Sequence, residues 1–426
     1  MTVNVLVFPC GTEIALEIHR ALSRAKDINL FGATSVSNNH GKFLFKNYIE
    51  GIPDVEEPNF ILEINKIVRE HNIHYIFPAH DSVVLRLSLE AERVECKVIC
   101  SPKRTCEVCR SKKKTYDYFR GIIPIPRIYQ NQEEILEYPV FLKPDIGQGS
   151  KGVAYAQLRK DVEYHISKDP SLIVMEYLPG REFTIDCLTD QNGKLIFYGG
   201  RERRRILNGI SVNTVRVEDE RFRLIAEKIN EHLVFRGAWF FQVKERKDGE
   251  LVLMEIAPRI AGTMATYRVL GVNFPLLSLL IHQGVPVEVL KNDYVVEVDR
   301  ALFNRYSIPI EYEEVYIDFD DTLIKNGKVN TELIAFAFQC INSGVKVKLV
   351  TRHKGNILET LRAYRLDGIF DQVYHISDGK SKSEIIQSNK SILIDDSFSE
   401  RAEVKRNKGI PVFDVDAVES LICWKA

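Results

Sequence analysis

The sequence predicts a multidomain protein that combines α/β and α+β folds. Residues up to about 105 alternate apolar strands with helical patterns, the middle of the chain mixes strands, helices and hairpin signals, and a new strand–helix–strand series begins near residue 313. A chain of 426 residues is long enough for roughly two to four domains. We therefore expect three domains, at residues 1–105, 106–312 and 313–426.

The first domain is expected to be a doubly wound α/β unit. Strands that alternate with helices form parallel sheets with helices on both faces. The expected strands are 3–8, 28–34, 73–79 and 96–101, and the expected helices are 15–25 and 60–71.

Composition and charge indicate small-molecule partners. The formal net charge is -1, so the chain lacks the basic field that attracts nucleic acid or a membrane surface. No stretch approaches the ~18 uncharged apolar residues of a membrane span. The N-terminus is interrupted by Asn4, Pro9 and Gly11 and is interpreted as a strand rather than a signal peptide. Eight cysteines without framework spacing fit a reducing compartment, so we expect a cytoplasmic protein.

Four of the cysteines lie close together in the sequence, at Cys96, Cys100, Cys106 and Cys109. Thiolates are good zinc ligands, but this spacing matches no common zinc module. Buried, reduced thiols are the preferred interpretation.

A glycine-rich loop follows the predicted strand that ends at Lys143. Gly147, Gly149 and Gly152 surround Ser150 in this loop. Glycines allow close approach of the backbone to a ligand, successive amides can surround phosphate oxygens, and a lysine adds a cation. A surface hairpin rich in glycine is the alternative.

The residues downstream of this loop follow a characteristic order. Glu176 ends an apolar strand, Glu182 follows a turn, Gln242 and Glu255 lie on two strands of a predicted hairpin, and Arg259 comes next. This ordered set resembles the ATP-grasp superfamily, in particular the carboxylate–amine ligases and the carbamoyl-phosphate-synthetase-like members, over residues 1–312. The resemblance implies that residues 1–105 form the Rossmann-like domain that precedes an ATP-grasp domain.

The resemblance also implies an ATP site. Lys112 and Lys143 would bind phosphates, and Gly149 and Ser150 would belong to a flexible flap over them. The positions implied to hold the adenine and the ribose are Glu176, Tyr177, Leu178 and Glu182.

The resemblance places Mg²⁺ on Gln242 and Glu255, and it assigns Arg259 to the transferring phosphoryl group or the substrate. Many relatives carry asparagine where this chain has Ala257. The change removes an oxygen ligand, which leaves the number of Mg²⁺ ions open. Taken singly, each of these polar residues could instead be a solvated charge or a structural pair.

Two basic runs, 112–114 and 201–205, are interpreted first as solvated faces. On a strand, however, Arg201, Arg203 and Arg205 would share one face and could bind phosphate or an acidic substrate. Arg201 or Arg203 is the preferred candidate.

A second carboxylate cluster begins at the end of a predicted strand in the third domain. Asp318 and Asp320 can face one crevice while Phe319 points away. Two close carboxylates favour a bound cation, and Mg²⁺ would leave one free to attack phosphorus and the other to move protons. Two aspartates spaced in this way, without further motifs, more often form an acidic turn after a strand.

Three later features complete a recognisable series: Thr351 ends a strand, Lys380 and Lys382 lie at a helix start, and Asp395 and Asp396 end another strand. The series resembles the haloacid-dehalogenase (HAD) superfamily of aspartate-based phosphatases. By that resemblance Asp318 is the nucleophile and Asp320 the general acid and base. The other implied roles are a phosphoryl-orienting hydroxyl on Thr351, a neutralising cation on Lys382 or less favourably Lys380, and Mg²⁺ ligands on Asp318, Asp320, Asp395 and Asp396.

The gaps between these motifs leave room for single helices but not for an inserted lid. This domain is therefore expected to be a capless HAD-like Rossmannoid. Without a lid it would take a large substrate, or be covered by the ligase half or by a second subunit in a homo-oligomer.

The sequence thus predicts a bifunctional enzyme. ATP and Mg²⁺ would serve an ADP-forming ligase that joins a small carboxylate to an amine, and the last domain would hydrolyse a phosphate ester. Two alternatives stay open: an ATP-grasp ligase with a non-catalytic HAD-like regulatory or binding module, and an ATP-binding sensor. The identities of the acid, the amine and the ester are not encoded in any motif.

Overall fold

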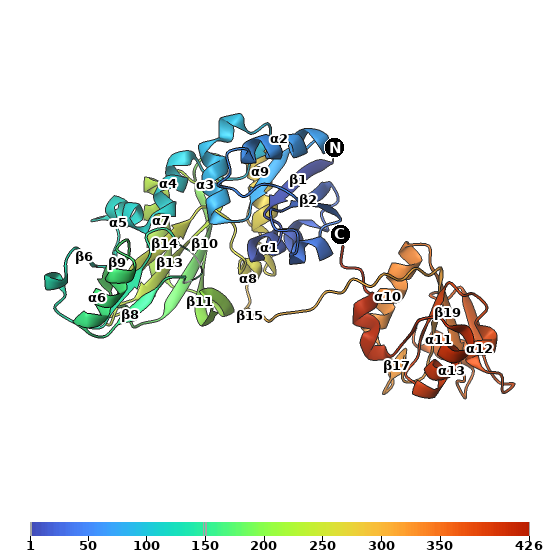
Figure 1. Ribbon diagram of the computed structural model, residues 1–426. Helices are drawn as coiled ribbons and strands as arrows, with labels where there is room; N and C mark the ends of the chain where they lie inside the picture. Colours follow the sequence, from blue (N-terminus) through green and yellow to red (C-terminus); the bar gives the residue numbers. More distant parts are fainter. Residues whose placement is uncertain (1, 148, 150, 426) are drawn as a thin grey trace. The chain divides into compact units, whose positions relative to one another are not determined.

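The computed structural model describes residues 2–147, 149 and 151–425, and it divides into two compact units. The first unit comprises Met1–Phe303 and the second Asn304–Lys425. Figure 1 colours the first unit from blue to yellow-orange and the second from orange to red. The combination of α/β and α+β elements predicted for a multidomain chain is confirmed, whereas the boundaries at 105 and 312 stay predictions. Within the described residues, no helix is long and apolar enough to span a membrane.

The first sheet is parallel and has the strand order β3-β2-β1-β4-β5. Side chains of β1 alternate between two cores, because Val5 and Val7 pack with α1 and α9 while Leu6 and Phe8 pack with α2 and α3. The strands are β1 (Val3–Phe8), β2 (Ile28–Ala33), β3 (Asn47–Ile49), β4 (Tyr75–Pro78) and β5 (Lys97–Val98). The helices are α1 (Glu13–Leu22), η1 (His40–Phe43), α2 (Phe60–Glu70), α3 (Asp81–Leu89) and η2 (Ala91–Arg93).

Two of these helices begin with a polar residue that fixes the helix start. The Thr12 hydroxyl accepts a hydrogen bond from the Ala15 amide at the start of α1, and the His80 ring accepts one from the Ser82 amide at the start of α3. Glu13 and Asp81 are consequently the first residues of their helices, each following the carboxyl end of a parallel strand.

A second, antiparallel sheet has the strand order β6-β9-β7-β8. Its buried residues, among them Val140 and Leu142, pack with Val162 of α6. The elements are α4 (Lys103–Arg110), α5 (Lys112–Phe119), β6 (Ile128–Tyr129), η3 (Gln132–Glu134), β7 (Val140–Lys143), β8 (Ala154–Ala156), α6 (Arg159–Lys168) and β9 (Ile173–Glu176).

A third sheet of six strands has the order β14-β13-β10-β11-β12-β15 and is antiparallel. The predicted hairpin is confirmed as β13 and β14, in which Gln242 is the register partner of Glu255. The elements are β10 (Glu182–Thr189), β11 (Leu195–Leu207), β12 (Ile210–Val217), α7 (Glu220–His232), β13 (Gly237–Glu245), β14 (Leu251–Ala257), α8 (Ala265–Arg268), α9 (Phe274–Gln283) and β15 (Glu297–Asp299).

The second unit contains a parallel sheet with the order β20-β19-β16-β21-β22 and a small hairpin of β17 and β18. On β16, Val315 and Ile317 pack with α10 and α11, whereas Tyr316 packs with α13. The strands are β16 (Glu314–Ile317), β17 (Ile324–Lys325), β18 (Lys328–Val329), β19 (Lys346–Thr351), β20 (Gln372–His375), β21 (Ser391–Ile394) and β22 (Val412–Phe413). The helices are α10 (Thr331–Asn342), α11 (Ile357–Ala363), α12 (Lys382–Ile385), α13 (Phe398–Lys408) and η4 (Val415–Leu421).

Candidate active sites

A cavity of about 180 Å³ is lined by residues of the four-stranded and six-stranded sheets of the first unit. We call it the first cavity. The structure brings to it the residues that the sequence assigned to ATP and its metal, with one exception, because Ser150 lies outside the described residues. Those residues are Lys112, Lys143, Gly149, Glu176, Tyr177, Leu178, Glu182, Gln242 and Glu255.

Lys143 is the most deeply buried cation of this cavity. Its ammonium donates to the Tyr116 hydroxyl at 2.7 Å, and that hydroxyl donates to the Met254 carbonyl at 2.8 Å. Burial lowers the pKa of Lys143 to about 7, with a further contribution from Lys112 and opposition from Glu255. The group therefore lacks a full counter-charge and would gain from an anion in the cavity.

Lys112 lies at the first position of α5, next to the same loop. Its ammonium donates to the Asp145 carbonyl at 3.2 Å, and burial lowers the pKa of Lys112. Gly149 adopts a φ of 62°, and a Cβ atom there would lie 3.4 Å from the Asn208 carbonyl oxygen. The glycine loop and the β11–β12 turn therefore approach closely.

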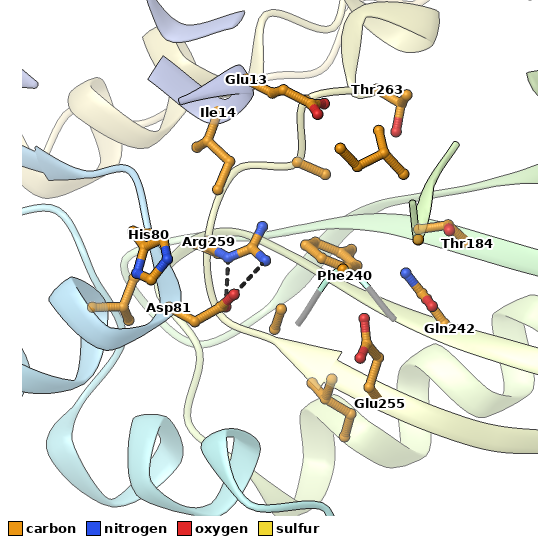
Figure 2. A pocket seen from close by; sticks show the side chains of 18 of the residues that line it. Glu13, Ile14, His80, Asp81, Thr184, Phe240, Gln242, Glu255, Arg259 and Thr263 are labelled. Carbon is orange, nitrogen blue, oxygen red and sulfur yellow. Dashed lines mark hydrogen bonds and ion pairs between the residues drawn. The ribbon is translucent and has the colours of Figure 1, made fainter. Parts of the chain in front are cut away.

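Gln242 and Glu255 offer oxygen atoms from neighbouring strands (Figure 2). The Gln242 carbonyl oxygen accepts from Arg203 at 2.7 Å. Among the described residues, the Glu255 carboxylate has no hydrogen-bond or ion-pair partner. Two such oxygens suit Mg²⁺ that also binds phosphate, and Ala257 adds no side-chain oxygen.

Arg203 contacts several of the predicted site residues. The sequence indicated Arg203 itself only weakly, as one of two candidate arginines in a basic run. Its guanidinium donates to Glu182 at 2.5 Å, to Gln242 at 2.7 Å and to the Gly209 carbonyl at 2.7 Å. Arg201, by contrast, is buried and pairs with buried Asp186 through contacts of 2.8 and 3.2 Å. Of the two arginines, Arg203 is therefore the one joined to the first cavity.

Glu176 uses its carboxylate within the protein. It accepts from the Arg246 guanidinium at 2.6 Å and from the Arg127 backbone amide at 2.8 Å. The backbone around Tyr177 and Leu178 is not fixed in this way, so it suits the adenine edge better than the carboxylate does.

A second cavity of about 330 Å³ shares Lys112, Arg203, Gln242 and Glu255 with the first. Its other walls include residues of α1 and α3 (Figure 2). Arg259 lies here and is held by Asp81 through contacts of 2.6 and 2.8 Å. The predicted role of Arg259 therefore requires that a ligand compete with Asp81 or bind the outer face of the pair.

A second ion pair lies at the same cavity. Arg300, which follows β15, donates to the Glu13 carboxylate at 2.5 Å. Neither Asp81 nor Glu13 was recognised from the sequence. Their position at the start of a helix after a parallel strand is the signal that could have indicated them.

The carboxylate cluster of the second unit is organised by Lys382. Its ammonium lies 2.6 Å from an oxygen of Asp318 and 2.6 Å from an oxygen of Asp395. Burial raises the pKa of Asp318 to about 6, although Lys382 lowers it. Burial would lower the pKa of Lys382, but the two carboxylates raise it above its ordinary value. Lys380 instead pairs with Asp378 on the surface, so Lys382 is the one of the two predicted lysines that contacts the carboxylate cluster.

Three carboxylates form a group that could hold a metal ion. Ligand atoms of Asp318, Asp395 and Asp396 all lie within 4.8 Å of one another. Thr322, which the sequence reasoning did not single out, orients Asp396 by donating to its carboxylate at 3.0 Å. An all-oxygen set of this size fits Mg²⁺ completed by water and phosphate.

Asp320 was also expected in this metal group, but the structure places its carboxylate elsewhere. It contacts the ring nitrogen Nδ1 of His353 at 3.0 Å, and its side chain is half exposed. Thr351 is fully buried at the end of β19, and its hydroxyl accepts from the His353 amide at 3.1 Å. His353 was missed because a lone histidine after a strand carries no spacing signal.

The four clustered cysteines, which were considered as zinc ligands, are free thiols of differing burial. Cys106 is buried and donates to the Ser101 carbonyl at 3.2 Å. Cys96, Cys100 and Cys109 are partly buried, and all four thiols are free. Within the described residues, the carboxylate group in the second unit is the one group of three or more Cys, His, Asp or Glu side chains that could hold a metal ion, and the clustered cysteines form no such group.

Comparison with known proteins identifies relatives of the first unit. A family model described as "ATP-grasp in the biosynthetic pathway with Ter operon" matches residues 168–301. The D-alanine–D-alanine ligase of Petrotoga mobilis is 28% identical over 173 residues, which cover 39% of this chain and 56% of that protein. The ligase of the same name from Thermotoga maritima is 30% identical over 94 residues, covering 20% and 31%. The chain thus spans about half the length, or less, of the curated relatives it matches.

Solved structures extend the likeness over 68–70% of the chain. The biotin carboxylase domain of Hydrogenobacter thermophilus 2-oxoglutarate carboxylase, in complex with MgADP and bicarbonate, matches with a TM-score of 0.59 at 16% identity, covering 70% of this chain and 74% of that one. The L-amino acid ligase from Bacillus licheniformis matches with a TM-score of 0.53 at 18% identity, covering 68% and 75%. At such identities the likeness concerns the fold. Together with the match at residues 168–301, the likeness is consistent with an ATP-grasp fold.

Proposed function

We propose that the first unit is an ADP-forming ligase that activates a carboxylate with ATP and passes it to an amine. The observation that carries the proposal is the junction of the two cavities, which share Lys112, Arg203, Gln242 and Glu255. A nucleotide in the first cavity would present its terminal phosphate at this junction to an acid in the second. Positioning and charge neutralisation are the main requirements of phosphoryl transfer.

The residues of the first cavity divide by chemistry. Lys143 and Lys112 supply cations for phosphate oxygens, and Glu182 accepts from the ribose hydroxyls. The backbone at Tyr177 and Leu178 meets the adenine edge. Gln242 and Glu255 would hold Mg²⁺, which neutralises charge on the phosphates when bound.

The reaction can be written with its bonds balanced. An oxygen of the acid attacks the γ-phosphorus of ATP, and the bond from phosphorus to the bridging oxygen breaks to release ADP. The amine then attacks the acyl phosphate, loses a proton and expels phosphate. Arg259 lies at the second cavity, where it can stabilise the acid or the transferring group.

The relatives support this class of reaction, because they include ligases named for D-alanine and for L-amino acids. The test is to mix the protein with ATP, Mg²⁺ and panels of acids and amines, and to measure ADP and phosphate. ADP formation that requires both an acid and an amine is the expected result. ATP binding without any acceptor-dependent turnover would favour the sensor alternative.

We propose that the second unit is a Mg²⁺-dependent phosphatase of the HAD type. The observation that carries this proposal is the position of Lys382 between Asp318 and Asp395. Asp318, Asp395 and Asp396 would hold Mg²⁺, which neutralises the phosphate when bound. Lys382 keeps Asp318 ionised despite its burial, as a nucleophile requires.

Hydrolysis would proceed in two displacements. Asp318 attacks phosphorus, the ester oxygen leaves with a proton from Asp320, and an aspartyl phosphate remains on Asp318. Asp320 then takes a proton from water, which attacks phosphorus and releases phosphate. Thr351 lies at the carboxyl end of β19, next to the end of β16 that leads to Asp318, and can orient the phosphoryl group.

Phosphate release from a broad panel of esters tests this proposal, with EDTA as the control. Beryllofluoride imitates a phosphoryl group on a carboxylate and should bind the wild type with Mg²⁺. Binding of phosphate esters without hydrolysis would favour the non-catalytic binding module instead.

A further inference from the structure

The Asp320 carboxylate has one side-chain partner within the described residues of the second unit, and this partner is His353. The ring nitrogen Nδ1 lies 3.0 and 3.1 Å from the two carboxylate oxygens. Asp320 is otherwise half exposed, with 54% of its side-chain surface accessible. A carboxylate in this position would sample several rotamers in water, so a single contact with a fixed group decides where it points.

His353 is itself held from several directions. Its ring nitrogen Nε2 lies 3.2 Å from the Thr360 hydroxyl of α11, and its ring packs edge-on against Phe319 with centroids 5.0 Å apart. Its backbone amide donates to Thr351, and its carbonyl oxygen lies 2.7 Å from a ring nitrogen of His375. Only 19% of its side-chain surface is accessible. The ring is therefore held in place, and Asp320 is the more exposed partner of the contact.

The hydrogen bonding of the ring suits a donor to Asp320. Because a carboxylate only accepts, Nδ1 is the donor in the contact with Asp320. The Thr360 hydroxyl donates to the Asn356 carbonyl oxygen at 2.9 Å, so Nε2 either donates to that hydroxyl from a doubly protonated ring or accepts from it when the hydroxyl turns away from Asn356. The same loop positions the Thr351 hydroxyl through the His353 amide. One residue thus connects the acid and the phosphoryl-orienting hydroxyl of the proposed reaction.

We propose that His353 is a positioning residue that directs the Asp320 carboxylate toward the leaving oxygen and then toward the attacking water. The role rests on the phosphatase function proposed above. His353 does not touch Asp318 or the metal-binding carboxylates in the structure, so it acts on proton transfer and not on the nucleophile.

Formation and hydrolysis of the aspartyl phosphate depend differently on proton transfer by Asp320, so they distinguish an effect on Asp320 from an effect on the nucleophile Asp318. Departure of 4-nitrophenolate from phosphorus needs no proton, so formation of the aspartyl phosphate from 4-nitrophenyl phosphate does not need Asp320. Hydrolysis of the aspartyl phosphate does need Asp320, because the attacking water must lose a proton. An alkyl ester such as 2-phosphoglycerol needs Asp320 in both steps.

The experiment compares wild type, His353→Ala and His353→Asn with both esters in the full chain with Mg²⁺. With 4-nitrophenyl phosphate, His353→Ala should give a stoichiometric burst of 4-nitrophenolate and then a steady state slowed about tenfold, a fraction of the effect of a general acid or base. With 2-phosphoglycerol, the steady-state rate of His353→Ala should fall about tenfold, without a burst. His353→Asn, whose amide nitrogen can occupy the place of Nδ1, should recover most of the rate.

Lys390→Ala is the control, because it removes an exposed pair with Glu313 just before the start of β21, whereas Asp395 follows the other end of that strand; its steady-state rates should stay within about twofold of wild type. Unchanged rates in His353→Ala would overturn the positioning role. Loss of the burst together with loss of beryllofluoride binding would overturn it too, since His353 would then hold the nucleophile site together. A wild type that hydrolyses neither ester would contradict the phosphatase function itself.

Discussion

The guanidinium of Arg259 is joined to the carboxylate of Asp81 by two contacts, of 2.6 and 2.8 Å, across 178 residues of sequence. Burial raises the pKa of Asp81, but Arg259 more than offsets this and keeps the pKa below its ordinary value. The pair joins the start of α3, which packs on the parallel sheet, to the segment that follows β14. The arginine that we propose for the substrate is therefore also an attachment between two parts of the first unit.

Asp81→Asn should destabilise the first unit, because it leaves the Arg259 charge buried with a neutral partner. We expect a loss of about 2 kcal/mol in the free energy of unfolding, measured by urea denaturation. Asp117→Asn is the control, since the Arg120–Asp117 pair is well exposed and should contribute little. An Asp81→Asn protein as stable as the control would contradict the attachment role.

Lys143→Ala should weaken ATP binding and abolish ADP formation, because it removes the buried cation beside the glycine loop. Titration calorimetry measures the affinity, and the phosphatase reaction of the second unit should be unaffected. Lys168→Ala, an exposed change on α6, serves as the control. Equal ATP affinity in the Lys143→Ala and Lys168→Ala proteins would remove Lys143 from the nucleotide site.

The lowered pKa of Lys143 predicts a pH dependence of stability. Between its folded value of about 7 and its ordinary value of 10.5, the unfolded chain binds a proton that the folded chain lacks. The contribution of Lys143 to the free energy of unfolding should therefore rise with pH across this window, and its penalty should be complete below pH 7. Lys143→Met should be more stable than wild type at pH 7, and the difference should shrink toward pH 10. A constant difference across this range would argue against a neutral lysine.

The same lysine predicts proton uptake on nucleotide binding. An ATP phosphate beside Lys143 favours the charged amine, so binding at pH 8 should take up protons and affinity should fall as pH rises above about 7. Calorimetry in two buffers with different ionisation enthalpies measures the uptake. Identical heats in both buffers would exclude it.

Asp318→Asn should abolish phosphate-ester turnover while the fold survives, since it keeps the shape of the side chain and removes the attacking charge. Asp320→Asn should slow turnover by about 10² to 10⁴. Beryllofluoride should fail to bind Asp318→Asn. ADP formation by the first unit should persist in both variants, and an Asp318→Asn protein that still hydrolyses esters would return the second unit to a binding role.

Local patterns made part of the architecture predictable. The alternation of Val5 and Val7 with Leu6 and Phe8 indicated a strand buried on two faces, and residues 3–8 are β1. The hairpin partners Gln242 and Glu255 were placed by residue type and order. In each case the signal lies within one short segment of chain, where side-chain period and turn chemistry determine the structure.

Contacts between distant segments could not be predicted in this way. Arg259 was expected at the site, but nothing near it in the sequence indicates that Asp81 holds it. Arg203 was one of two equal candidates until the fold paired Arg201 with Asp186. His353 carries no motif, and its contact with Asp320 depends on how β16 and β19 pair in the sheet.

The shared junction of the two cavities has a consequence for how this protein could diversify. Residues that line the second cavity alone include Glu13, Asp81 and Arg300, which lie on α1, on α3 and after β15. The residues restricted to the first cavity, such as Lys143 and Leu178, lie on or near strands of other sheets. Under the proposed ligase function, substitutions at the helix starts would alter which acceptor is used while nucleotide handling is inherited unchanged. A new substrate preference would then require few mutations and no new catalytic apparatus.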